Sequence, residues 1–290
     1  HDVGMRPPSK KNLKGDVRGY DVRSGKLLWT FHTIPAKGEP GYETWLNGSA
    51  ETASNAGVWA PMAADAELGL VYLPVEAPLA DTFGGVRPGN NVYGNSLVCL
   101  DAKSGQVVWY FQMIHHDIWD WDNPTSPILM DLVVDGKPIK AVAQITKQAF
   151  VYTFDRTNGK PVWPIEERPV GQTDVPGEVV PPTQPFPTKP PAFDRQGFTD
   201  DDLIDFTPAL RAEAIEGTKA FRKGPIFTPP SLANEKDGTS GTLMLPSFTG
   251  GANWEGGAFD PETGMLYIGS YTQPSIGVLH PEPQFSDMQY

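Results

Sequence analysis

One short segment of the chain gathers many of the side chains that could do chemistry. It holds three carboxylates, two imidazoles and two indoles within eight residues, in the order His115-His116-Asp117-Ile118-Trp119-Asp120-Trp121-Asp122. The segment directly follows the apolar stretch Trp109-Tyr110-Phe111, which we expect to end a strand. Side chains of these types exchange protons and bind metal ions, so a strand exit that carries them is a candidate site.

The residue types alone leave two interpretations of this segment open. The aspartates could accept hydrogen bonds from the backbone amides of their own loop, with the tryptophans packed between sheets. His115, His116 and Asp117 could instead bind a metal ion, although adjacent histidines on an extended segment point to opposite faces. Spacing by itself favours the first interpretation.

Two repeated patterns organise the rest of the chain. The first places Asp, Gly and Trp at offsets of 0, +4 and +8, and it occurs three times, ending at Trp29, Trp109 and Trp163. Each copy follows an apolar stretch and predicts a strand, a turn with a positive-φ glycine, and a second strand. The second pattern starts at Trp59 and again at Trp254, with Asp, Gly and Tyr at equal offsets. Alternating hairpins of two types build four-stranded antiparallel blades, so the sequence predicts an all-β fold, a β-propeller.

We predict one partial propeller domain over residues 1–290, because the repeats account for about half of a ring. A first blade closes near 19–31, a complete blade lies at 56–111, part of another at 139–165, and a later blade opens at 240–270. Uncovered sheet faces and strand edges would favour self-association of this half-ring, or its aggregation, when the chain is made alone.

A proline-rich insertion separates the repeats at about 164–198. Its nine prolines exclude regular helix and favour an extended, ordered loop that crosses the top of the propeller. A short helix is expected after it, at about 208–216, where Thr207 supplies an N-cap and Pro208 the first helical residue.

Composition narrows the classes of function. The net charge of -12 argues against nucleic-acid binding, which needs clustered Lys and Arg. The single cysteine, Cys99, excludes an internal disulfide, a C-x-x-C redox pair and a C-x-x-C-H haem attachment, so redox chemistry would need a non-covalently held cofactor. We expect Cys99 to be buried and unreactive, because its neighbours are apolar. No apolar run approaches the ~18 residues of a membrane helix, so we expect a soluble domain.

Several separated motifs resemble one family. The Trp-ended repeat, the segment 115–122 and Lys147, which lies 27 residues beyond Asp120, are similar to quinoprotein dehydrogenases that use pyrroloquinoline quinone (PQQ). The sequence most resembles the glucose-dehydrogenase-like group of that family, from Gly15 to about Pro281. The family fold is an eight-bladed propeller, and the resemblance implies that this chain forms its central part.

The resemblance implies roles for individual residues. Asp120 stands at the family's catalytic carboxylate, which accepts the substrate hydroxyl proton as hydride leaves the same carbon. Lys147 stands at the basic position that faces the reactive quinone oxygens and stabilises the charge developing there. Trp59 matches the indole on which the flat cofactor stacks, and Asn253-Trp254 resembles the pair that meets the cofactor edge. A solvent-exposed lysine and purely structural tryptophans are the alternatives that the residues themselves leave open.

The resemblance also implies a calcium ion, a hard cation that takes oxygen ligands and polarises the reactive carbonyl. Asp120 would supply one ligand. This sequence has neither Asn nor Thr at the family's next ligand position, and Glu76 is the nearest oxygen donor. The family's upstream glutamate would fall near Ser9-Lys10-Lys11, which has no carboxylate.

We therefore expect a periplasmic quinoprotein dehydrogenase that oxidises a sugar or alcohol hydroxyl and passes electrons to a separate acceptor, a quinone or cytochrome. One alternative is a quinoprotein-like propeller that has lost catalysis and acts as a binding or assembly scaffold. Another is carbohydrate binding without turnover. Asp120, Lys147 and Trp59 together favour the enzyme, because a scaffold has no use for that polar pair.

Overall fold

The computed structural model describes residues 13–234, 236, 238–281, 287 and 290. Strands dominate this part of the chain: β1 (Val17–Tyr20), β2 (Leu27–Phe31), β3 (Ala63–Asp65), β4 (Leu70–Pro74), β5 (Ser96–Asp101), β6 (Val107–Gln112), β7 (Ile128–Val134), β8 (Lys137–Ile145), β9 (Val151–Asp155), β10 (Ile165–Pro169), β11 (Thr183–Pro187), β12 (Ser231–Leu232), β13 (Thr242–Met244), β14 (Gly257–Asp260), β15 (Met265–Ile268) and β16 (Ser275–Leu279). The helices are short: α1 (Ser49–Thr52), α2 (Pro208–Gly217) and 3-10 turns at Tyr42–Thr44, Leu46–Gly48 and Asp200–Asp202. No helix in these residues is long and apolar enough to cross a membrane.

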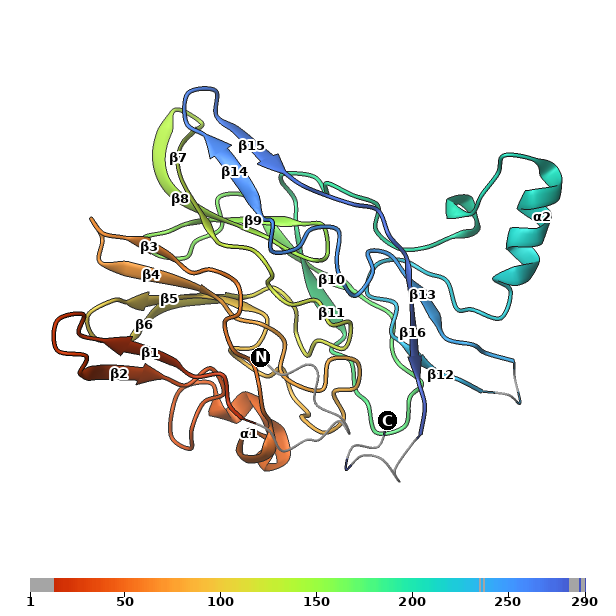
Figure 1. Ribbon diagram of the computed structural model, residues 1–290, viewed down its shortest axis with the longest axis horizontal. Coiled ribbons are helices and arrows are strands. Elements are labelled where there is room, and N and C mark those ends of the chain that lie inside the picture. The colour runs from red at the N-terminus through yellow and green to blue at the C-terminus, as the bar shows by residue number, and fades with distance from the viewer. Residues whose placement is uncertain (1–12, 235, 237, 282–286, 288–289) are drawn as a thin grey trace.

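Four antiparallel sheets lie next to one another in the order in which they occur along the chain (Figure 1). They are β1-β2, β3-β4-β5-β6, β7-β8-β9 and β14-β15. Figure 1 shows them in chain order, from the red β1-β2 hairpin to the blue β14-β15 hairpin. The four-stranded sheet is the complete blade predicted at 56–111. No sheet closes a ring within the described residues, so the count of eight blades stays a prediction.

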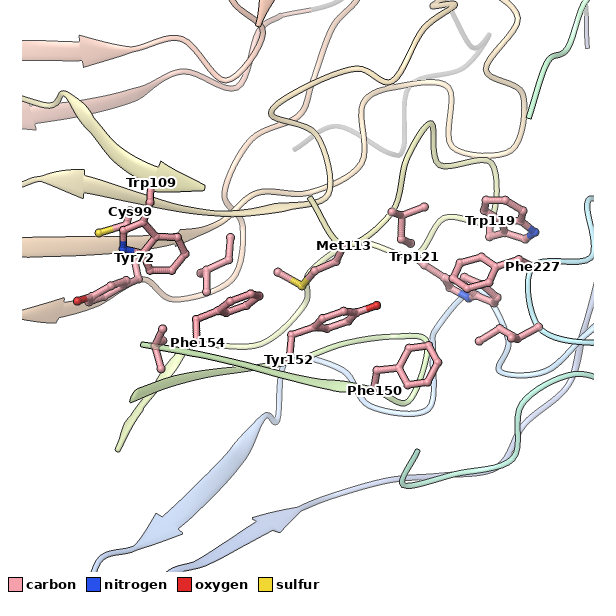
Figure 2. Packing of buried hydrophobic residues seen from close by; sticks show 14 of the residues in the cluster. Tyr72, Cys99, Trp109, Met113, Trp119, Trp121, Phe150, Tyr152, Phe154 and Phe227 are labelled. Carbon is pink, nitrogen blue, oxygen red and sulfur yellow. The ribbon is translucent and has the colours of Figure 1, made fainter. Parts of the chain in front are cut away.

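The main core lies between these sheets and extends to Trp119 and Trp121 of the Asp-rich segment 115–122. Strand β5 is buried along almost its whole length, because β4 and β6 flank it and place Cys99 opposite Tyr72 and Trp109. Burial raises the pKa of the Cys99 thiol to about 12, as expected for an unreactive cysteine. Figure 2 shows the main cluster running without a break from Trp109 to the aromatic rings near Trp119.

Two of the three repeated tryptophans, Trp29 and Trp109, each join their own sheet to the next one along the chain. Nε1 of Trp29 and Nε1 of Trp109 each donate, at 3.1 Å, to the carbonyl that follows the repeat aspartate in the next sheet. Each indole also covers the repeat glycine there: a Cβ built on Gly105 or Gly159 would lie 2.5 or 2.6 Å from the ring. The repeat glycine thus has two roles, a positive φ in its own turn and room for the neighbouring indole.

Replacing Gly159 with alanine separates these two roles. Gly159 and Gly136 share a φ of 74°, but only Gly159 lies under an indole, whereas a Cβ on Gly136 would meet nothing within 4 Å. Both substitutions cost the left-handed strain of a Cβ, about 1–2 kcal/mol. We expect Gly159→Ala to lower the free energy of unfolding by about 1–3 kcal/mol more than Gly136→Ala, because it also overpacks Trp109. Equal losses in urea titrations would contradict the docking role.

Three local predictions need correction. The insertion at about 164–198 is not only an extended loop, because β10 and β11 pair within it; prolines are tolerated there since both strands are sheet edges. The third Trp-ended hairpin is reduced to a single bridge between Phe154 and Pro161, because proline cannot donate to the ladder. The segment 240–270 is divided between two sheets, since β13 pairs with β16 and not with β14.

Helix α2 lies where the capping pattern predicts it. It spans Pro208–Gly217, and Thr207 Oγ1 accepts a hydrogen bond from the Leu210 amide at 3.2 Å. The helix projects from the molecule, far from the sheets that hold the Asp-rich segment (Figure 1). It therefore takes no part in positioning the candidate site.

Candidate functional site

The Asp-rich segment is a rigid loop held by its own side chains. Asp117 is buried, and its carboxylate accepts hydrogen bonds from the amides of Trp119 at 2.8 Å and Trp121 at 2.9 Å. It also accepts from Asn95 Nδ2 at 3.0 Å. The two indoles stack with centroids 5.8 Å apart and planes 17° apart, anchoring the loop in the core. Asp117 thus caps its own loop, as the first interpretation of the segment expects, and the two amides that it holds are those of the residues on either side of Asp120.

Asp120 meets Lys147 at this loop. The Lys147 ammonium donates to the Asp120 carbonyl oxygen at 2.6 Å, lies 3.3 Å from Asp120 Oδ1 and donates to Asp122 Oδ2 at 3.1 Å. The Lys147 side chain is only 6% exposed, whereas that of Asp120 is 30% exposed. The lysine is therefore not a solvent-exposed residue at a strand end. It is a buried cation whose carboxylate partner keeps access to a ligand.

The local charges make this pair chemically distinctive. Burial raises the pKa of the Asp120 carboxyl well above its usual range; Lys147 opposes that shift and the Asp122 carboxylate adds to it. Burial lowers the pKa of the Lys147 ammonium, but Asp122 and Asp120 outweigh burial and raise it above the usual value. Lys147 thus stays charged. A raised pKa makes the ionised Asp120 carboxylate a stronger base, but only that ionised form accepts a proton, so the fraction of Asp120 able to act as a base increases with pH.

Asp122 connects the Asp120–Lys147 pair to the segment that carries Glu76 and Ala77. Asp122 Oδ1 accepts from the Ala77 amide at 2.8 Å, and the buried Glu76 accepts from the Gly57 amide at 2.7 Å. A cavity of about 340 Å³ opens beside Glu76 and the half-buried Trp59. Two basic residues, Lys14 and Arg18, also line this cavity. Asp16, whose carboxylate lies 3.4 Å from Arg18, and Glu76 line it too, so the cavity combines an indole face with both basic and acidic side chains.

The loop with Asn253 and Trp254 lies on the other side of Lys147. The Gly251 amide donates to the Lys147 carbonyl at 2.8 Å, and a Cβ on Gly250 would lie 2.6 Å from Lys147. Asn253 uses its side-chain amide within its own loop, accepting from the Trp254 amide at 2.8 Å. Trp254 is 67% exposed. The structure brings this loop next to Lys147 and leaves the indole open to solvent, so its contact with a cofactor stays a prediction.

The described residues do not assemble a complete metal site. No group of three or more His, Cys, Asp or Glu side chains among them is arranged to hold a metal ion. His115 and His116 turn to different partners, Glu167 at 3.0 Å and Glu178 at 2.7 Å, which removes the metal interpretation of that pair. The predicted upstream ligand position, Ser9-Lys10-Lys11, lies outside the described residues.

Sequence reasoning missed two contributors to the site. Asp122 receives no role of its own in the sequence analysis, although its i+2 spacing from Asp120 is a signal that both could face one cation. Arg87 is completely buried and donates to the Asp117 carbonyl and, at 2.8 Å, to the Ala80 carbonyl. Nothing in its glycine- and proline-rich surroundings distinguishes Arg87 from a surface arginine.

Comparisons with known proteins identify the family of this chain. Residues 3–290 match the family described as "Glucose/ethanol/alcohol dehydrogenase, beta-propeller domain". Quinoprotein glucose dehydrogenase A of Acinetobacter calcoaceticus is 34% identical over 94% of this chain and 34% of its own length. The glycerol dehydrogenase large subunit of Gluconobacter oxydans is also 34% identical, over 87% of this chain and 33% of its own. The chain thus spans about a third of the length of these relatives.

Solved structures support the fold. The quinohemoprotein alcohol dehydrogenase ADHIIG from Pseudomonas putida HK5 superposes with a TM-score of 0.61 at 23% identity, covering 94% of this chain and 35% of that one. A europium-containing methanol dehydrogenase also gives a TM-score of 0.61, at 18% identity, covering 93% of this chain and 42% of that one. On the sequence match and the fold together, the chain belongs to the PQQ-dependent glucose/ethanol/alcohol dehydrogenase β-propeller family.

Proposed function

We propose that this chain carries the active site of an enzyme that oxidises a CH–OH group of a sugar or alcohol with PQQ. The observation that carries the proposal is the buried Lys147 ammonium bonded to Asp120, whose carboxylate is still partly exposed. Relatives named for glucose, glycerol and quinate share hydroxyl-bearing substrates, which supports this substrate class.

The cavity beside Trp59 is the proposed PQQ site, supported by its indole and its two basic side chains. PQQ is a flat, tricyclic tricarboxylate that accepts a hydride when it is bound. Trp59 offers a flat indole face, and Lys14 and Arg18 in the same cavity complement the carboxylates. Asp122 accepts from the Ala77 amide, next to Glu76 in the cavity lining, and also from Lys147, which supports a single site for the indole and the cation.

Each side chain of the polar group has its own task in the proposed reaction. The Asp120 carboxylate accepts the substrate hydroxyl proton at Oδ, the group's exposed end. Lys147 supplies a fixed positive charge that needs no rearrangement when negative charge develops nearby. Asp122 orients the Lys147 ammonium and balances its charge inside the protein.

Calcium is part of the proposal through two candidate ligands, Glu76 and Asp120. Calcium takes about 6–8 oxygen ligands. These two carboxylates would supply only some of them, and one oxygen of Glu76 already accepts from the Gly57 amide. Oxygens of the cofactor and of other parts of the protein would have to complete the coordination.

The proposal extends to partners and location. A separate quinone or cytochrome would take the electrons, in line with an Acinetobacter baylyi relative named quinate/shikimate dehydrogenase (quinone). We propose the periplasm as the location, as the family resemblance implies. Self-association of the isolated 290-residue chain stays a prediction, which light scattering during gel filtration measures. The non-catalytic scaffold stays the alternative, and it requires no PQQ binding.

Substituting Trp59 tests the cofactor site. We expect Trp59→Ala in the complete protein to weaken PQQ binding by about tenfold, because a stacked aromatic pair contributes about 0.5–1.5 kcal/mol beyond the area it buries. Trp59→Phe retains a flat face and should lose less. Absorbance titration with PQQ measures both dissociation constants. Equal PQQ affinity in the alanine variant and the wild type would place the cofactor elsewhere and favour a structural tryptophan.

A further inference from the structure

A buried ion pair joins the proline-rich insertion to the loop that carries Asp120. His116 Nε2 lies 2.7 Å from Glu178 Oε1, and each side chain is 2% exposed. Glu178 belongs to the stretch between β10 and β11, and His116 to the Asp-rich segment 62 residues earlier. The same two segments also meet at β11, where the Gln184 side chain accepts from the His115 amide and donates to the His115 carbonyl, both at 2.8 Å.

The surroundings of His116 determine where its hydrogens are. Nδ1 lies 2.8 Å from the Gly89 carbonyl oxygen, which can only accept, so Nδ1 carries a hydrogen. The Glu178 carboxylate accepts from the Gly84 amide and from a second backbone amide. Burial raises the pKa of Glu178, but His116, Arg87 and Gly84 outweigh burial and lower it. Both ring nitrogens of His116 thus face oxygen acceptors, Gly89 O and Glu178 Oε1.

Arg87 extends this pair toward the catalytic loop. Its Nη1 donates at 2.8 Å to Asn91 Oδ1, which also lies 3.1 Å from His116 Nδ1. Its Nη2 donates to the Asp117 carbonyl oxygen. Arg87, His116 and Glu178 thus form one buried polar network at the start of the Asp-rich segment, and Asp117 joins it through its backbone carbonyl.

The network ends on the two amides that flank Asp120. The Asp117 carboxylate accepts both of them, at 2.8 and 2.9 Å. His116 and Asp120 have φ values of 51° and 56°, which cost a non-glycine residue about 1 kcal/mol or more. A loop with strain at both points keeps this conformation only while its surroundings hold it there.

We propose that Glu178 and His116 are positioning residues for Asp120, and that the proline-rich insertion serves as a clamp on the catalytic loop. The inference rests on the proposed function, because it takes Asp120 as the proton acceptor. Neither residue is placed against the substrate. Their effect passes through Asp117 to the backbone on both sides of Asp120.

The test compares two glutamates of the same insertion in the complete protein. Glu178→Ala removes the buried partner of His116. Glu167→Ala is the matched control, because it removes a 50% exposed partner, 3.0 Å from the neighbouring His115. Hydrogen exchange of the peptide 115–122, measured without cofactor, should be about tenfold faster in Glu178→Ala and unchanged in Glu167→Ala. Unchanged exchange in Glu178→Ala would overturn the clamp, whatever the enzyme does.

Turnover per bound PQQ tests the link to chemistry. We expect it to fall about tenfold in Glu178→Ala while KM changes less than about twofold, because a misplaced base slows the reaction without removing substrate contacts. Glu178→Gln keeps a hydrogen bond to His116 and should restore most of the rate. A loss of PQQ-binding sites with normal turnover at those remaining would mean a merely structural role. If the wild type neither binds PQQ nor turns over, the proposed function fails and the catalytic half of this inference fails with it, while the exchange result still decides the clamp.

Discussion

Asp120→Asn lowers the turnover of the complete, PQQ-loaded protein by about 10²–10⁴-fold, the usual contribution of a general base. Asparagine keeps the size of the side chain and can still accept a hydrogen bond from Lys147, but it cannot take up the substrate proton. The loop should keep its shape, because Lys147 also bonds the backbone carbonyl of residue 120 at 2.6 Å and Asp117 holds the flanking amides. Dye-linked oxidation measures the rate.

Two controls keep this result specific. Asp205→Asn changes an exposed aspartate outside the site and should leave turnover unchanged. Thermal unfolding of Asp120→Asn should show one cooperative transition, as in the wild type, and PQQ should still bind. Near-normal turnover in Asp120→Asn would remove Asp120 from the role of proton acceptor and leave the chemistry to another group.

Lys147→Met affects both stability and turnover. Methionine replaces the aliphatic stem but leaves the Asp122 carboxylate buried without its cation, and breaking a buried pair costs about 3–5 kcal/mol. The reacting centre also loses its fixed positive charge, so turnover should fall by about 10²-fold or more. Denaturant titration and steady-state rates measure the two effects separately.

Lys140, which lies on strand β8 just before the loop that carries Lys147, offers a matched comparison. Its ammonium lies 2.8 Å from Glu67 in an exposed pair. Surface pairs of this kind contribute about 0–1 kcal/mol, so Lys140→Met should have little effect on stability and none on turnover. If the two lysine variants lost equal stability and both kept wild-type rates, Lys147 would be only another surface cation.

The hairpins could be predicted from the sequence because their turn chemistry is local. In the copy that starts at Asp101, the aspartate accepts from the Ser104 amide and hydroxyl, both at 2.7 Å, and the turn closes on Gly105. All the partners lie within five residues, so spacing alone indicates the structure. Asp120 and Lys147 could be named only through family resemblance, because their contact depends on how two loops meet.

Long-range packing could not be predicted in this way. The docking of Trp109 on Gly159 depends on the position of the next sheet, and a glycine in a turn already has a sufficient local explanation. Glu178 lies in a segment with no repeat and no periodicity, so nothing in the sequence pairs it with His116. At Pro161 a local pattern predicts too much. The repeat predicts a second strand there, but proline has no N–H to donate, and only a single bridge to Phe154 forms.

The most direct test of the central claim is a single-turnover experiment on the complete protein. PQQ is loaded, oxygen is removed, and a panel of sugars and alcohols is mixed in while the absorbance of the bound cofactor is followed. The account predicts that the wild type binds PQQ and that at least one compound reduces it quickly. It also predicts that Asp120→Asn binds PQQ with similar affinity and reduces it about 10²–10⁴-fold more slowly. A wild-type protein that does not bind PQQ, or an Asp120→Asn variant that reduces it at the wild-type rate, would contradict the account.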